Sequence, residues 1–262
     1  MTMTPEQAAW FQSTFTRLVE NIDKALQGKP EVVSLVLSAM LAEGHVLLED
    51  APGTGKTSLA KALAATVQGT SSRIQFTPDL LPSDVTGVTI YDQQNHKFEF
   101  HKGPIFASIV LADEINRASP KTQSALLEVM EESRVTVDGV THEAGRPFLV
   151  IATQNPVEQA GTYKLPEAQL DRFLIKTSIG YPSLAVTESI LAGAAQRNPA
   201  AGLSAVITTS AVADMADLAA TVHVEPAVLL YAAELAEATR GDSAIKLGVS
   251  VRGAIAMIRI AK

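Results

Sequence analysis

A glycine-rich turn between an apolar run and a helical pattern restricts the fold of this chain more than any other feature. The turn reads Asp50-Ala51-Pro52-Gly53-Thr54-Gly55-Lys56-Thr57 and follows the apolar run 45–48. Glycines let the backbone wrap closely around an anion, and a helix that begins near Thr57 points free N–H groups at the same place. The segment therefore predicts a strand, a phosphate-binding loop and a helix in succession.

Each residue type in this turn has an expected role toward a bound triphosphate. Lys56 is expected to reach the β- and γ-phosphates, and the Thr57 hydroxyl to ligate Mg²⁺. The strict pattern begins with glycine, whereas this chain has Asp50, which tolerates unusual backbone angles better than most residues. A chance glycine-rich turn is the alternative. The residues expected to contact the nucleotide are Pro52, Gly53, Thr54, Gly55, Lys56, Thr57 and Ser58.

Short apolar runs alternate with helical patterns along the first two thirds of the chain. Runs of this length without strict alternation are typical of parallel strands buried on both faces. We therefore predict an α/β fold with a parallel sheet flanked by helices. The runs cover 45–48, 73–76, 108–112, 148–152 and 173–179.

Capping signals mark the first residues of two helices. Thr4-Pro5-Glu6-Gln7 combines an N-cap, a first-turn proline and a capping-box partner, and predicts a surface helix to about Leu26. Ser119-Pro120 predicts another helix, whose apolar face carries residues 126, 127 and 130. Two β-hairpins are also predicted, over 87–101 and, around an Asp-Gly turn, over 135–141. They are candidate interaction elements, although decorative loops would have the same spacing.

The composition changes after Gly180-Tyr181-Pro182, where strand-like runs stop and alanine-rich helical patterns follow. Residues 198–202 are typical of a linker, and three helices are predicted over 210–222, 226–240 and 251–262. We therefore expect an N-terminal helix (1–26), an α/β nucleotide-binding domain (27–182) and a small all-α lid (183–262). The last helix reaches residue 262 without a stop signal, which favours a domain that continues further in the natural protein.

The apolar run 108–112 ends in two carboxylates, Asp113 and Glu114. At such a strand end the first carboxylate is expected to hold Mg²⁺, and the second to activate water as a general base. A solvated strand end is the alternative. A paired Asp-Glu favours water over a substrate hydroxyl as nucleophile, and the missing Asn-Lys-x-Asp segment favours adenine over guanine. Asn155 ends the next run and is placed to orient the water, although Asn-Pro is also a common turn initiator.

Composition excludes several other classes of function. The chain has no cysteine, which rules out disulfides, zinc fingers and thiol catalysis and fits a cytoplasmic location. Its net charge of −7 argues against a general nucleic-acid binder. No apolar run approaches the roughly 18 residues that span a bilayer.

Four motifs occur together and in order: residues 50–57, 112–118, 152–156 and 167–173. With them the chain, from about Leu26 to Lys262, resembles the MoxR family of AAA+ ATPases, in the helix-2-insert clade of P-loop NTPases. The resemblance implies that Asn155 is the sensor 1 residue and that Arg172 is an arginine finger entering a neighbouring subunit's site. Arg252 matches sensor 2, a lid arginine facing the γ-phosphate, although the family usually has proline where Val251 stands. Gly28 and Lys29 match the adenine-side segment.

The same resemblance implies a biological role. ATP is expected between the α/β domain and the lid, with Mg²⁺ on Thr57 and Asp113. Relatives form rings, commonly hexamers, and act as chaperone-like remodellers, often with partners that carry a von Willebrand factor type A domain. Two alternatives stay open. One is a magnesium-chelatase-like or nucleic-acid-remodelling motor, and the other is a nucleotide-switched scaffold with negligible hydrolysis.

Overall fold

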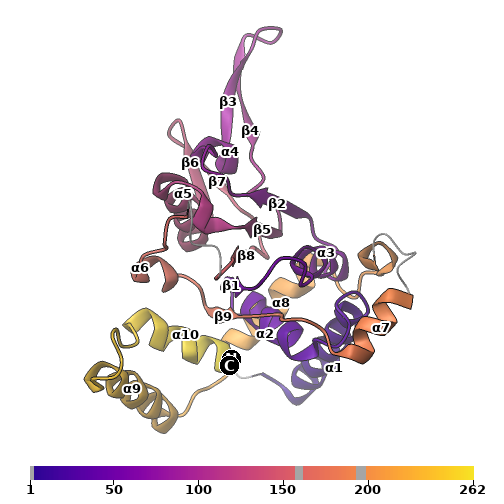
Figure 1. Cartoon of the computed structure of the whole chain (residues 1–262), viewed down its shortest axis with the longest axis vertical. Coiled ribbons are helices and arrows are strands. Elements are labelled where there is room, and N and C mark those ends of the chain that lie inside the picture. Colours follow the sequence, from indigo (N-terminus) through magenta and orange to yellow (C-terminus); the bar gives the residue numbers. More distant parts are fainter. Residues whose placement is uncertain (1–2, 157–161, 193–198) are drawn as a thin grey trace.

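The computed structural model describes residues 3–156, 162–192 and 199–262 (Figure 1). Its centre is a five-stranded parallel sheet with strand order β2-β5-β8-β1-β9, which confirms the predicted α/β fold. Because all five strands run the same way, their carboxyl ends meet at one edge of the sheet. The strands are β1 (Val46–Glu49), β2 (Ser71–Gln75), β5 (Ile109–Asp113), β8 (Leu149–Gln154) and β9 (Ile175–Thr177).

The three inner strands are buried on both faces, as predicted. In β1, Val46 and Leu48 belong to the hydrophobic core on one side of the sheet, and Leu47 belongs to the core on the other. The prediction was wrong for the two edge strands. In β2 only Ile74 is buried, and β9 is half-buried or exposed, because the helices cover the middle of the sheet more fully than its edges.

Helices cover both faces of the sheet. The first core lies between the sheet and α1 (Pro5–Asp23), α2 (Pro30–Leu41), α3 (Lys56–Thr66) and α8 (Thr209–Ala220). The second core includes α4 (Pro82–Thr86) and α5 (Pro120–Glu132). The predicted capping box of α1 forms, with Gln7 donating its N–H to Thr4 Oγ1 at 3.2 Å, and Ser119 caps α5.

Both predicted hairpins are present. The first, β3 (Gly87–Asp92) with β4 (Lys97–Lys102), projects far from the body of the molecule (Figure 1). The second pairs β6 (Arg134–Val137) with β7 (Val140–Glu143). Its turn residues Asp138 and Gly139 have φ angles of 50° and 78°, as a two-residue hairpin turn requires. Two short elements complete this half: η1 (Ile115–Arg117) and α6 (Glu167–Leu170).

The part after residue 182 is helical, and the three predicted helices are confirmed. They are α8, α9 (Pro226–Gly241) and α10 (Val251–Ala261), preceded by α7 (Leu184–Ala192), which was not predicted separately. The predicted linker is in part a 3-10 turn, η2 (Pro199–Gly202), while Asn198 lies outside the described residues. Val212 and Met215 of α8 are buried in the core beside α2. Within the described residues, no helix is both long and apolar enough to cross a membrane.

Candidate nucleotide site

The carboxyl ends of the sheet strands surround a cavity of about 410 Å³. The loop after β1, the end of β5 and the residue after β8 contribute to it, so most of the predicted site residues are brought together. Thr54, within the loop, is buried and is not among the residues that line the cavity. The lining residues are Pro52, Gly53, Gly55, Lys56, Thr57, Ser58, Arg73, Gln75, Asp113, Glu114 and Asn155.

The phosphate loop has the backbone that an anion cradle needs. Gly53 and Gly55 have φ angles of 83° and 100°, in the left-handed region that favours glycine. A Cβ built on Gly53 would meet no atom within 4 Å, so this side of the loop is open. Helix α3 begins at Lys56, and its N-terminal N–H groups face the cavity end of the loop. The geometry predicted for this segment is therefore present.

The donor set fits a triphosphate with Mg²⁺. The Lys56 ammonium reaches only the carbonyl oxygen of Asp50, at 3.4 Å, among the contacts found for it. The Thr57 hydroxyl and the Asp113 carboxylate, both on the cavity wall, are oxygen ligands of the kind that Mg²⁺ prefers. Asn155 lines the same cavity, as expected for a residue that contacts the γ-phosphate or its attacking water.

Hydrogen bonds fix the two carboxylates at the end of β5. Thr153 on β8 donates its hydroxyl to Asp113 Oδ1 at 2.6 Å and accepts the N–H of Glu114 at 3.0 Å. Arg73 forms an ion pair with Asp113 Oδ2 at 2.6 Å. Glu114 itself has φ 57°, and its carboxylate accepts bonds from Gln75 at 2.7 Å and from the Arg117 guanidinium at 3.0 Å.

Three of these partners were missed from sequence: Arg73, Gln75 and Thr153. Arg73 and Gln75 flank Ile74 on β2, so both point to the opposite face of the strand from that buried residue. Two polar residues that are two positions apart on a predicted strand share one face of it, and this pattern could have indicated that Arg73 and Gln75 face the site. Their contact with Asp113 and Glu114, about 40 positions away, depends on the pairing of β2 with β5.

The predicted adenine-side residues lie next to the phosphate loop but do not line the cavity. The Leu26 side chain lies against the loop, since a Cβ built on Gly55 would come within 2.8 Å of Leu26 Cδ1. Gly28 has φ 75° and is packed against Val186 of α7. Lys29 donates from Nζ to the carbonyl of Tyr181 at 2.9 Å.

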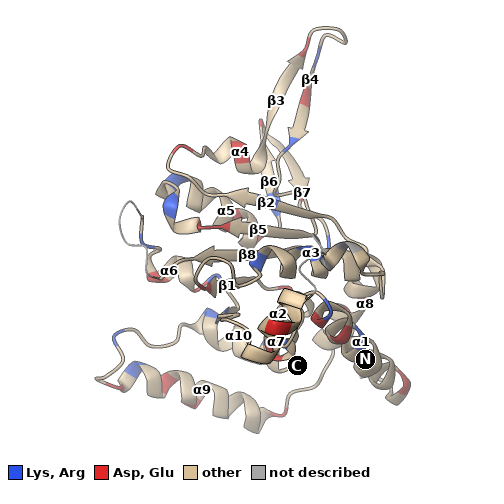
Figure 2. Cartoon of the chain, turned by 45° about the vertical axis from the view of Figure 1, so that its right-hand side comes forward, with Lys and Arg blue, Asp and Glu red and all other residues tan. Residues whose placement is uncertain are grey.

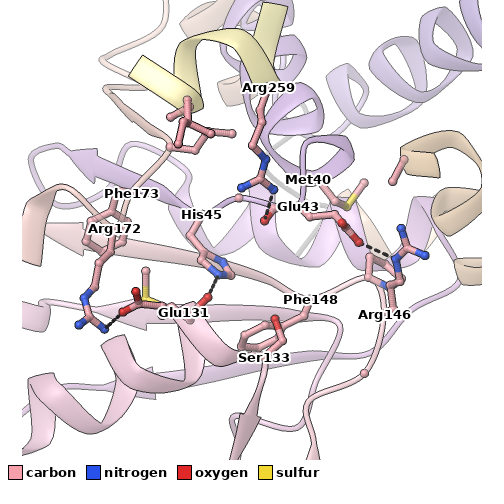
Figure 3. A pocket seen from close by; sticks show the side chains of 18 of the residues that line it. Met40, Glu43, His45, Glu131, Ser133, Arg146, Phe148, Arg172, Phe173 and Arg259 are labelled. Carbon is pink, nitrogen blue, oxygen red and sulfur yellow. Dashed lines mark hydrogen bonds and ion pairs between the residues drawn. The ribbon is translucent and has the colours of Figure 1, made fainter. Parts of the chain in front are cut away.

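Arg172 and Arg252 lie at the opposite, amino-terminal edge of the sheet. They border a second cavity, of about 830 Å³, among residues that precede β1, β8 and β9 (Figure 3). Arg172 contacts Glu131 Oε2 at 3.0 Å and the Leu127 carbonyl at 2.6 Å, and Arg252 is bonded to the other oxygen of Glu131. Arg252 therefore does not border the phosphate-loop cavity of its own chain, because α10 packs at the amino ends of the strands, and its role toward the γ-phosphate stays a prediction.

His45, which borders this second cavity, is a buried neutral histidine. Its Nδ1 accepts the N–H of Val150 at 3.0 Å, so the proton must be on Nε2, which donates to the Met130 carbonyl at 2.9 Å (Figure 3). Burial lowers the pKa of His45 from 6.5 to about 4. The side chain therefore joins β8 to the end of α5 only in its uncharged form.

This pKa predicts a loss of stability in mild acid. The unfolded chain binds a proton at His45 below pH 6.5 and the folded chain only near pH 4, so the stabilisation is present above 6.5 and lost as the pH falls toward 4. At 1.36 kcal/mol per pKa unit the loss is about 3 kcal/mol. Urea unfolding between pH 4 and 7 measures it. His45→Gln, which cannot titrate, should be less stable at pH 7 and show a shallower pH dependence; equal slopes would contradict the assignment.

The fold and this cavity define a class of protein. A strand, a glycine-rich loop, a helix N-terminus and an Asp-Glu pair at the end of a second parallel strand, here β5, characterise P-loop nucleoside triphosphatases. Comparison with known proteins agrees. Residues 45–175 match the family model described as ATPase family associated with various cellular activities (AAA).

Relatives narrow the class further. The chain is 40% identical to Chaperone MoxR1 of Mycobacterium tuberculosis, over 95% of this chain and 68% of that protein. It is 50% identical to the uncharacterized protein YeaC of Bacillus subtilis, over 94% and 77% respectively. A crystal structure of a candidate ATPase from Cytophaga hutchinsonii superposes with a TM-score of 0.88 at 37% identity, covering 97% of this chain and 80% of the other. The chain belongs to the MoxR family of AAA+ ATPases.

Proposed function

We propose that this protein hydrolyses ATP with Mg²⁺ and uses the cycle to remodel a partner protein, as a ring in which neighbouring chains complete each other's sites. The observation that carries the proposal is the cavity that joins Lys56 and Thr57 to Asp113, Glu114 and Asn155. The groups needed to bind a triphosphate and activate water are present there, and the one arginine among the lining residues, Arg73, is paired with Asp113.

Each residue in the cavity has a role set by its chemistry. Lys56 and the N–H groups of α3 bind the phosphates, and Thr57 and Asp113 hold Mg²⁺. A Mg²⁺ ion held by these two residues would supply charge neutralisation at the transferred phosphoryl group. Glu114 accepts the proton of the attacking water, and Asn155 orients that water. For this, Glu114 must exchange its bonds to Gln75 and Arg117 for one to water.

A further cation for the transition-state charge is supplied from a neighbouring chain. Arg172 and Arg252 share Glu131 at the edge of the sheet opposite to Lys56, and neither borders the cavity that Lys56 lines. A head-to-tail ring brings that edge of one chain to the phosphate site of the next. We therefore assign both arginines to the neighbour's γ-phosphate, and take a hexamer as the expected ring.

Remodelling is assigned to the protruding hairpin of β3 and β4. Its exposed apolar side chains include Ile90, Tyr91 and Phe98, and Tyr91 and Phe98 contact each other with ring centres 5.1 Å apart. An exposed apolar hairpin suits contact with another protein. The name of the relative Chaperone MoxR1 supports this direction. A von Willebrand factor type A protein in the cytoplasm is the partner class that we propose.

Two alternatives are separated by measurement. A scaffold that binds ATP without hydrolysing it is favoured by one observation: Asp113 and Glu114 are both engaged by side chains, Arg73 and Gln75 among them. A nucleic-acid motor is less favoured, since the net charge is −7 and basic and acidic residues are interspersed on β4, where Lys97 pairs with Glu99 at 2.7 Å (Figure 2).

The test is phosphate release measured against protein concentration at saturating ATP and Mg²⁺. Because Arg172 must come from a neighbour, turnover per chain is expected to rise with concentration and then to level off as rings fill. Lys56→Ala, which removes the phosphate ligand, should lose both ATP binding and turnover. ATP binding with only background hydrolysis at every concentration would replace the motor with the scaffold.

A further inference from the structure

Asp50 occupies the position where the strict phosphate-loop pattern has glycine. Its φ is not positive, so the backbone at this point does not need glycine. Its side chain is buried, with 5% of the residue exposed. A buried carboxylate is costly unless hydrogen bonds satisfy it, so its partners indicate why an aspartate is present.

The partners are two backbone amides where the chain leaves the sheet. Asp50 Oδ2 accepts the N–H of Ile179 at 2.6 Å, and Oδ1 accepts the N–H of Gly180 at 2.9 Å. Hydrogen bonds to a charged acceptor are roughly twice as strong as neutral ones. The first residue of the phosphate loop is thereby bonded to the segment that leads from β9 to α7.

That segment forms a wall beside the phosphate loop together with residues 26–29. Lys29 Nζ donates to the Tyr181 carbonyl at 2.9 Å, and a Cβ on Gly28 would come within 2.9 Å of Val186 Cγ2. Leu26 in turn lies against Gly55 of the loop. We call residues 26–29 and 179–186 the lateral wall. The lateral wall contacts the phosphate loop at two places: Leu26 lies against Gly55, and the backbone amides of 179 and 180 bind Asp50.

We propose that Asp50 is a positioning residue that holds the lateral wall, which includes the expected adenine-side residues Gly28 and Lys29, to the phosphate loop. The inference rests on the proposed function in taking ATP as the ligand. The backbone of Asp50 supports it: its carbonyl accepts from Lys56 Nζ at 3.4 Å. One residue thus contacts the phosphate-binding lysine and, through its side chain, the wall.

The experiment compares two ligands that share phosphates but not a base. Binding of ATP and of inorganic tripolyphosphate, each with Mg²⁺, is measured by calorimetry on the full chain, as wild type and as Asp50→Gly. Glycine suits the loop, so the phosphate cradle stays intact while the two bonds to the wall are lost. ATP binding is expected to weaken about tenfold, the cost of ordering a freed segment, with tripolyphosphate binding unchanged within about twofold.

Controls separate this result from a general effect. Lys29→Met, which removes the other polar tie within the wall, should show the same selective loss for ATP, whereas Lys56→Ala should lose both ligands. If Asp50→Gly does not fold, as judged by thermal unfolding, Asp50→Asn keeps the size and one acceptor oxygen, and should weaken ATP selectively but less.

Equal weakening of both ligands, or of neither, in the Asp50 variants would overturn the inference. These results are distinct from failure of the proposed function, in which the wild-type chain itself would bind no ATP or would bind ATP with only background hydrolysis. The inference is tested by comparing the Asp50 variants with a wild type that binds ATP normally. The proposed function is tested by measurements on the wild-type chain.

Discussion

Replacing Arg172 by alanine is expected to lower ATP turnover on the order of 10³-fold while ATP affinity stays within a few-fold. The reason is that the guanidinium acts on charge that develops during phosphoryl transfer, and it lies at the edge of the sheet opposite to Lys56 of its own chain. Steady-state phosphate release at ring-forming concentration measures the loss. Arg17→Ala, a variant of an exposed arginine on α1, is the matched control and should retain full turnover.

A mixing experiment shows whether Arg172 acts on a neighbour. The Arg172→Ala chain keeps its own cavity, and the Glu114→Gln chain keeps its Arg172. In mixed rings an intact cavity can face an intact arginine, so mixing two nearly inactive proteins is expected to restore activity. Absence of any recovery would mean that Arg172 serves its own chain, through its contacts with Glu131 and Leu127.

Glu114→Gln is the second large effect, a loss of about 10²- to 10⁴-fold in turnover with ATP still bound. Glutamine has the size of glutamate and can accept the bond from Gln75 or Arg117 through its oxygen, but it cannot take a proton from water. Single-turnover hydrolysis of bound ATP isolates this step from product release. If Glu114→Gln kept the wild-type rate, Glu114 would not be the general base.

The matched control for this variant is Glu20→Gln on the exposed surface of α1. It changes the net charge of the chain by the same amount and leaves the cavity untouched. A rate equal to wild type in this control assigns the loss in Glu114→Gln to the site, since both variants have the same formal charge.

Features that depend on neighbouring residues could be predicted from the sequence. The capping box of Thr4 and Gln7, the N-cap of Ser119 and the Asp138-Gly139 turn each depend on a few adjacent dihedral angles, and all three are present. The phosphate loop belongs to this group, because glycine at 53 and 55 allows the left-handed φ angles that form the cradle. The carboxylates at the end of β5 follow from an apolar run that stops at a polar pair.

Features that depend on which segments pack together could not be predicted in this way. Gln75 meets Glu114 only because β2 pairs with β5, and Asp50 binds the amides of 179–180 only because β1 lies beside β9. The sequence patterns also predicted that β2 is buried on both faces. The strand is instead at an edge of the sheet, where only Ile74 is buried.

The clearest division is between Lys56 and Arg252. The sequence by itself determined the chemistry of the first, because a lysine at the end of a glycine-rich loop is positioned by the turn that carries it. The location of the second was decided by α10, which packs at the amino ends of the strands and brings Arg252 to Glu131 beside Arg172. Local turns are set by short-range backbone preferences. The position of α10, which is far along the chain from Lys56, is set by the surfaces that the helix buries, and those surfaces exist only once the sheet has formed.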